Sequence, residues 1–281
     1  MAPQPVATNG VSTAFGPLAR LAAANGQFPD IALVSSDSVR FHVHTSVLRS
    51  ASSNDFGGLF HAQANSHNIH IDEAAPALNI MLHSAYGLDI VPYTPNWSML
   101  EEGTEAMRRY AIRPPTPTDP LFTLLLSQVH RPGGAQAVYA LAAQCEFDAL
   151  AVAASEHLLS LDLSSITDEW ATQCGPVYIK RLFFLHLGRT EALKRIVSAS
   201  PTLHVPWPGC SRDEQQQNIL RPWSFAVAQL IAEARPDVPN SLIETRLSPV
   251  AYRSTCVECS ELVAAHIRAI TQEWSNVKHT I

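Results

Sequence analysis

Residues 28–72 contain three short stretches whose apolar and polar positions follow the patterns of β-strands rather than of helices. Residues 31–35 form a short apolar run, residues 39–44 alternate strictly, and residues 68–72 alternate again. Turn-forming residues separate the first two stretches closely enough for a hairpin. The sequence therefore predicts three strands in the first quarter of the chain.

Helical periodicity dominates the rest of the chain. The clearest amphipathic helix spans 78–86, with apolar residues at spacings of three and four, and a stop at Gly87. A further helix is predicted over 97–110, and shorter ones over 17–24, over 45–49 and after Ser52 or Ser53. Later helices are expected at 121–129, 135–145, 147–159, 177–187, 190–198, 223–231 and 263–274, with Gly175, Pro176 and Gly188 as breaks and 201–222 as a Pro-rich loop.

A Pro-rich stretch, residues 113–120, divides these two patterns. It contains four prolines, which cannot continue a helix and favour an extended linker. The pattern predicts an α+β domain over 14–112, with a short three-stranded sheet plus helices, followed by a mainly α-helical region over 121–281. Residues 1–13 are small and polar and are expected to form a disordered arm.

Several local motifs occur along the predicted α+β domain in a characteristic order. They comprise an opening strand with an acidic residue, an aromatic-x-Val-His segment followed by Val-Leu, a Ser-x-x-Phe-x-x-Leu segment, and a helix that ends in Tyr-Gly. The residues that carry these motifs are Asp30, Phe41, His44, Leu48, Phe56 and Tyr86. Together they resemble the BTB/POZ domain. The whole chain also resembles uncharacterised fungal BTB proteins, which append a helical C-terminal region that often contains Cys-x-x-Cys and a Trp-bearing helix.

The resemblance implies protein–protein interaction. BTB domains commonly form homodimers through an N-terminal helix and sometimes an exchanged strand. Residues 17–24 could supply that helix, but no strand is apparent before it. Many BTB domains also bind cullin scaffolds with the help of a hydrophobic-x-Glu motif, and residues 60–66, where it would lie, contain no Glu. This departure argues against cullin binding.

Composition narrows the function classes. A net charge of −6 over 281 residues provides no basic footprint for nucleic acid. The longest apolar stretch, 135–154, is interrupted by polar and acidic residues and does not suit a bilayer. Residues 1–13 lack the features of a secretory signal, so an intracellular protein, cytoplasmic or nuclear, is expected.

The five cysteines form an odd and sparse set, unlike a secreted disulfide framework. Cys256 and Cys259 are the only pair with metal-like spacing, and a structural zinc needs about four ligands. Cys210 or His204 could complete such a site only if the Pro-rich loop folded back. The expectation is a pair of reduced, packed thiols with no metal and no cofactor.

No nucleotide-binding, metalloprotease, hydrolase or EF-hand motif occurs, so the sequence predicts a binding protein rather than an enzyme. Three hypotheses follow. The chain is a BTB scaffold with a helical partner-binding region, a substrate adaptor of a cullin-type ubiquitin ligase, or a zinc-binding or enzymatic helical domain.

Overall fold

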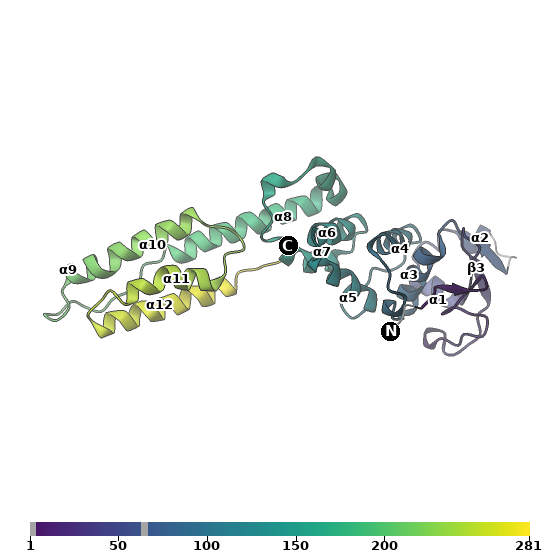
Figure 1. Ribbon diagram of the computed structural model, residues 1–281, viewed down its shortest axis with the longest axis horizontal. Helices are drawn as coiled ribbons and strands as arrows, with labels where there is room; N and C mark the ends of the chain where they lie inside the picture. Colours follow the sequence, from purple (N-terminus) through teal and green to yellow (C-terminus); the bar gives the residue numbers. More distant parts are fainter. Residues whose placement is uncertain (1–3, 63–66) are drawn as a thin grey trace. The chain divides into compact units, whose positions relative to one another are not determined.

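The computed structural model describes residues 4–62 and 67–281, which form two compact units that divide between Ala154 and Ser155 (Figure 1). The Pro-rich stretch 113–120, suggested by the sequence as a boundary, lies inside the first unit. Three further helices belong to that unit as well: α5 (Pro120–Ser127), α6 (Gly134–Gln144) and, except for its last residue, α7 (Asp148–Ser155). The first compact unit therefore extends well beyond the domain expected over 14–112.

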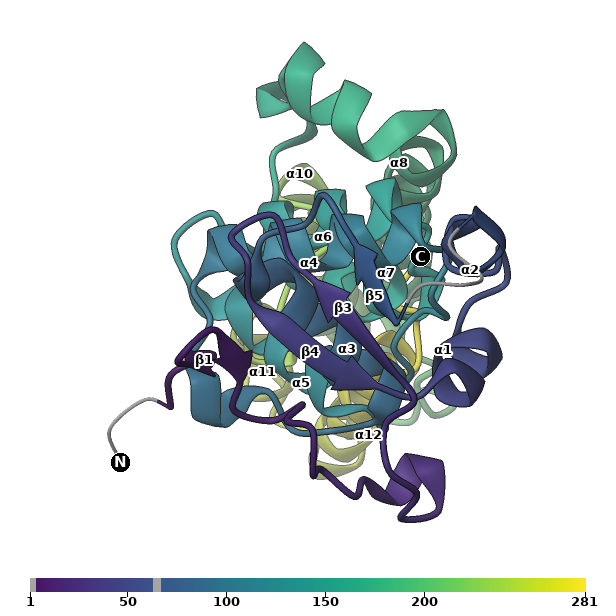
Figure 2. The same cartoon turned by 90° about the vertical axis from the view of Figure 1, so that its right-hand side faces the viewer.

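The three predicted strands are present and lie side by side in one mixed sheet (Figure 2). Strands β3 (Ile31–Val34) and β4 (Arg40–Val43) pair antiparallel, with Leu33 opposite Phe41. Strand β5 (Asn68–His70) runs parallel to β3 on its other side. The predicted α+β class of the N-terminal domain is confirmed.

Two further strands extend the sheet in the segment that was expected to be a disordered arm. Strands β1 (Ala7–Thr8) and β2 (Val11–Ser12) form a hairpin, and β2 pairs parallel with β4 to give the order β1-β2-β4-β3-β5. Asn9 and Gly10, at φ 52° and 73°, make the left-handed turn that a two-residue hairpin requires. The strands are too short to show alternation, and β2 depends on a partner far along the chain.

Two short helices predicted in this domain are also corrected. Residues 17–24 contain only the 3-10 turn η1 (Ala22–Ala24), because an eight-residue helix without a packing partner is marginal in water. The helix expected after Ser52 is a series of turns followed by α2 (Leu59–Ala62). Gly57 and Gly58, at φ 67° and 75°, interrupt helical geometry there.

The remaining helices of the first unit include α1 (Thr45–Ala51), α3 (Ala75–Tyr86), the 3-10 turn η2 (Val91–Tyr93) and α4 (Trp97–Arg109). Helix α3 lies behind the sheet in Figure 2 and packs against α4. The two helices approach closely at Gly103, where an added Cβ would lie 2.7 Å from Cβ of Ile80. This contact fixes the helical layer that supports the sheet.

The second unit is helical throughout its regular elements. Its principal helices are α8 (Asp168–Val197), α10 (Arg221–Ala232), α11 (Asn240–Ala251) and α12 (Val257–Ser275). They share one core, which is centred on leucine, isoleucine and valine side chains together with Trp223 and Trp274. Trp274 donates its Nε1–H to the carbonyl oxygen of Val238 at 2.8 Å, so the indole is both packed and hydrogen-bonded.

Three details of this unit differ from the sequence prediction. Helix α8 continues through Gly188, where the sequence predicted a break. The break predicted at Gly175 is present as a kink, because its φ of 72° and ψ of 165° are not helical. The loop expected over 201–222 contains α9 (Arg212–Gln215) and a π-helical turn, η6 (Gln216–Leu220). Helix α11 was not predicted, because its polar positions and Pro249 obscure the apolar period.

Arg189 attaches the C-terminal segment to α8. Its side chain is buried, and its guanidinium donates to the carbonyl oxygens of Pro236 at 2.7 Å, Val277 at 2.8 Å and Lys278 at 3.1 Å. The same guanidinium lies 4.3 Å from the ring centroid of Trp274. A planar, permanently charged fork suits this arrangement of several carbonyls and an aromatic face.

Candidate functional site

His44 and Tyr86 form a buried hydrogen-bonded pair that joins the end of β4 to the end of α3. The backbone N–H of His44 donates to the Tyr86 hydroxyl at 2.7 Å, and His44 Nδ1 lies 3.0 Å from the same oxygen. His44 Nε2 lies 3.0 Å from the carbonyl oxygen of Gln27, which can only accept a hydrogen bond. In the neutral imidazole Nε2 therefore carries the proton, and the Tyr86 hydroxyl donates to Nδ1. Burial raises the pKa of Tyr86 far above its ordinary value, which keeps the hydroxyl protonated.

The other motif residues surround this pair. Asp30 Oδ1 accepts the backbone N–H of Thr45 at 2.8 Å and so orients the start of α1. Phe41, Leu48 and Phe56 are fully buried. All six motif residues thus contribute to packing or to backbone hydrogen bonds in the first unit.

Phe56 shows how the local sequence positions one of these side chains. Ser52 Oγ accepts the backbone N–H of Phe56 at 2.8 Å and donates to the carbonyl oxygen of Tyr110 at 2.7 Å. The Phe56 ring then stacks on Tyr110, with ring centroids 4.6 Å apart. The turn thereby connects the segment after α1 to the end of α4.

Comparison with known families agrees with this arrangement of residues. Residues 21–115 match the family model of the BTB/POZ domain. The chain carries a BTB/POZ domain. No curated protein matches the chain in a search of such sequences. The BTB domain is a protein-interaction family, so the function suggested by this part of the chain is binding to other proteins.

Beyond the BTB match, helix α8 has an exposed apolar face, which we call the α8 stripe. It consists of Val177, Phe183, Phe184 and Leu187, whose exposed fractions are 63%, 37%, 63% and 56%. Residues at spacings of three, four and seven share one side of a helix, so these side chains form a continuous strip. None of the BTB motif residues belongs to it.

Positive charge accompanies the α8 stripe. Lys180 Nζ lies 5.6 Å from the ring centroid of Phe184. A cavity of about 530 Å³ opens beside Phe184, and Arg181 and Lys278 are among the residues that line it. The stripe therefore has an apolar centre and a basic margin. Within the described residues, no helix is both long and apolar enough to cross a membrane.

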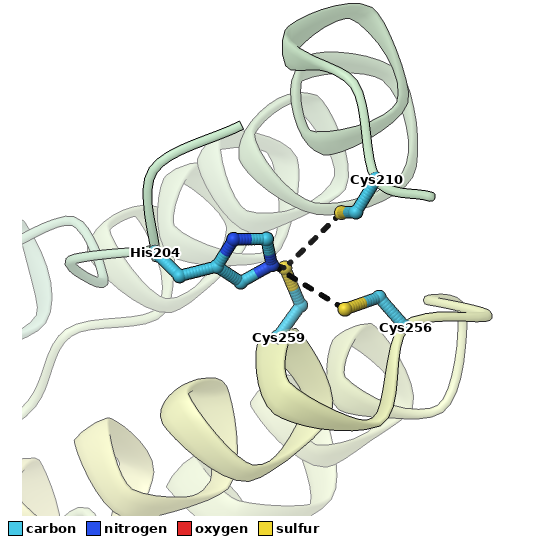
Figure 3. A group of neighbouring side chains, drawn as sticks. All are labelled: His204, Cys210, Cys256 and Cys259. Atoms are coloured by element: carbon cyan, nitrogen blue, oxygen red, sulfur yellow. Dashed lines mark hydrogen bonds between the residues drawn. The ribbon is translucent and has the colours of Figure 1, made fainter. Parts of the chain in front are cut away.

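A second cluster lies at the other end of this helical unit, where His204, Cys210, Cys256 and Cys259 converge (Figure 3). Their ligand atoms all lie within 4.8 Å of one another. From the sequence, His204 or Cys210 could join Cys256 and Cys259 only if the Pro-rich loop folded back. In the structure the loop does fold back, and both residues lie beside the pair. Cys256 occupies the N-cap position of α12 and Cys259 lies in the first turn of that helix, while His204 and Cys210 come from the loop.

Local structure sets the position of Cys210. Trp207 and Cys210 exchange two backbone hydrogen bonds, of 3.1 and 2.9 Å, which close a tight turn in the loop. Ser211 follows directly and caps α9 in a reciprocal capping box with Glu214. Cys210 is thus held between a turn and a helix start, and its side chain is directed toward α12.

The surroundings of Cys256 and Cys259 shift the pKa values of their thiols in opposite directions. A backbone hydrogen bond from Cys259, at the start of α12, lowers the pKa of the Cys256 thiol to about 7. Burial raises the pKa of the Cys259 thiol to about 12. Sequence spacing identified this pair as metal-like, but only the fold shows that His204 and Cys210 both lie beside it.

Proposed function

We propose that the chain is a non-enzymatic interaction scaffold, in which the BTB domain self-associates and the helical unit binds another protein through the α8 stripe. The BTB match supports the first half of this proposal. The α8 stripe carries the second half, because several large apolar side chains on one exposed helix face are typical of interaction surfaces. Its linear shape suits a helical partner rather than a globular surface.

The charges around the α8 stripe favour an amphipathic partner helix whose flanks are acidic. Lys180 and Arg181 lie on or beside the stripe, so a second copy of α8 would bring like charges together. An acidic flank would be attracted to the same margin. The partner is therefore proposed to be a different protein, with an apolar helix face bordered by Glu or Asp.

Binding of designed peptides tests this surface. A labelled leucine-faced helical peptide with Glu flanks is titrated against the full chain by fluorescence anisotropy, beside the same peptide with Lys flanks. The Glu-flanked peptide should bind more tightly, and a Phe184→Ser substitution should weaken it by about tenfold or more, as expected for a buried aromatic anchor. Phe225→Ser, at an equally exposed position on α10, is the matched control and should bind as the wild type does. If both substitutions weaken peptide binding equally, or if neither peptide binds, the α8 stripe is not the proposed binding surface.

Self-association of the BTB domain is supported by its N-terminal segment. Leu18 is 79% exposed, and β1 is one of the two edge strands of the sheet. An exposed strand edge and an exposed leucine are common elements of a contact between two copies. Sedimentation velocity should show a dimer that Leu18→Ser weakens and that His70→Ser, at an exposed position of β5 on the opposite edge of the sheet, leaves intact. A strict monomer at all concentrations would contradict self-association.

Cullin binding is not part of this proposal. Phe60, His61 and Ala62 follow the Phe56 turn, while Gln63 to Ser66 lie outside the described residues. The sequence of this stretch contains no Glu, so we expect no complex with a purified cullin N-terminal domain. A stoichiometric complex in gel filtration would instead favour the ubiquitin-ligase adaptor.

A further inference from the structure

We propose that His204, Cys210, Cys256 and Cys259 bind one structural zinc ion that joins the loop before α9 to the start of α12. This site lies in the helical unit and is independent of the interaction function proposed above. It differs from the expectation of packed thiols without metal that the sequence alone supports.

Three distances within the cluster are close to those of a tetrahedral zinc site, and all four ligand atoms lie within 4.8 Å of one another. His204 Nε2 lies 3.3 Å from Cys256 Sγ and 3.1 Å from Cys259 Sγ, and the Sγ atoms of Cys210 and Cys259 are 3.6 Å apart (Figure 3). Zinc bonds of about 2.3 Å to sulfur and about 2.0 Å to nitrogen place two sulfurs about 3.8 Å apart, and sulfur and nitrogen about 3.6 Å apart. These three distances would each need to lengthen by about half an ångström or less for the ion to bind.

A disulfide does not explain the same geometry. Its sulfur atoms are bonded at about 2.0 Å, far closer than the 3.6 Å between Cys210 and Cys259. A disulfide would also use only two of the four groups and would leave the imidazole and the third thiol without a role. Convergence of three sulfurs and one ring nitrogen on a single point is the ligand set of a Cys3His zinc site.

Surrounding groups orient the ligands as they do in metal sites. His204 Nδ1 lies 2.8 Å from the carbonyl oxygen of Val205, so Nδ1 carries the proton and Nε2 is free to bind metal. Gln215 is buried, and its side-chain amide donates to the carbonyl oxygen of His204 at 3.1 Å and contacts Cys259 Sγ at 3.8 Å. An N–H donor directed at a sulfur stabilises its thiolate form.

The loop needs such a connection because it has little apolar packing of its own. Val205 is 84% exposed and Trp207 is 54% exposed, whereas Cys210 and Cys259 are buried in the core of the unit. Four protein ligands leave no open coordination position for substrate, so the ion would be structural rather than catalytic. Its proposed role is to hold the loop, and with it α9, against α12.

Metal analysis of the full chain, purified without a histidine tag and under reducing conditions, tests the site. We expect about one zinc per chain by mass spectrometry of the elements. Cobalt added to the metal-free protein should give the visible bands of a tetrahedral ion and a thiolate charge-transfer band. Cys259→Ser should lose the zinc and the cobalt spectrum, and Cys174→Ala, which changes a buried cysteine of the same unit outside the cluster, should keep both.

A second variant distinguishes the loss of a zinc ligand from misfolding of Cys259→Ser. His204→Cys supplies a fourth thiolate, so it should retain zinc while its cobalt charge-transfer band becomes stronger; His204→Ala should bind zinc more weakly. Wild-type protein with native helical circular dichroism but neither zinc nor a cobalt spectrum would overturn the proposal. So would a Cys210–Cys259 disulfide in freshly alkylated protein, or zinc in His204→Cys with an unchanged cobalt spectrum.

Discussion

Substitution of Tyr86 by phenylalanine isolates the polar contact at the centre of the BTB domain. The ring remains and continues to pack edge-on against Phe15, at a centroid distance of 5.2 Å. Only the hydroxyl is lost, and with it the hydrogen bonds to the backbone N–H and to Nδ1 of His44. His44 is almost completely buried, so water cannot replace the missing partner without a local opening.

The expected cost follows from these two contacts. A buried donor or acceptor left without a partner costs about 1–3 kcal/mol, so the free energy of unfolding should fall by about that amount. Hydrogen exchange of the peptide that covers β4 and α1, measured in the full chain, reports this change for the BTB domain itself. Because α1 begins at Thr45, directly after His44, its amides should lose protection together with those of β4.

Tyr93→Phe is the matched control in the same unit. Its hydroxyl lies 3.4 Å from Thr13 Oγ1 in an exposed contact, which contributes little. Its loss should change the exchange free energy by no more than about 0.5 kcal/mol. If Tyr86→Phe changes the protection of β4 and α1 no more than Tyr93→Phe does, the assigned role of the His44–Tyr86 pair is incorrect.

Three further predictions concern packing, pH and the C-terminal segment. Gly103→Ala should destabilise the protein by about 1–3 kcal/mol in urea titrations, because the new methyl group would meet Ile80. Gly188→Ala, whose methyl group meets nothing within 4 Å, should instead stabilise it by up to about 1 kcal/mol, and equal effects of the two would refute the packing argument. Burial lowers the pKa of His83, so the unfolded chain takes up a proton below about pH 6.5 while the folded protein does not. The urea midpoint should therefore be highest above that pH and fall as the pH is lowered, and the fall should be less steep in His83→Gln. An equally steep fall of the midpoint with pH in the variant would contradict this role of His83. Arg189→Lys should cost about 1.5–3 kcal/mol and expose the C-terminal segment to proteolysis, because lysine cannot donate to three separated carbonyls, and unchanged proteolysis would contradict this role.

The regular elements of the BTB domain could be read from the sequence because their information is local. The strands β4 and β5 lie in stretches that alternate with a period of two, β3 lies in a short apolar run, and α3 carries apolar residues at helical spacing. The motif residues Asp30, His44 and Tyr86 were also recognisable from their neighbours. The hydrogen bonds between His44 and Tyr86 were not, because these residues are 42 positions apart.

Tertiary contacts decided the features that the sequence left out or misplaced. The hairpin β1–β2 forms because β4 offers it an edge, and residues 17–24 do not form a helix because no surface covers Leu18. Gly188 does not end α8, because the packing of the surrounding turns outweighs the modest helix cost of one glycine. In each case a long-range contact, or its absence, outweighed a local preference.

By itself the sequence determined an α+β BTB domain followed by a helical region, and it singled out the Cys256–Cys259 pair. Only the tertiary structure brought His204 and Cys210 to that pair, across separations of 52 and 49 residues. It also showed which apolar residues of α8 are buried and which remain exposed. The physical reason is the same for both features. Periodicity records the conformation of neighbouring residues, whereas ligand sets and exposed faces depend on how distant segments pack.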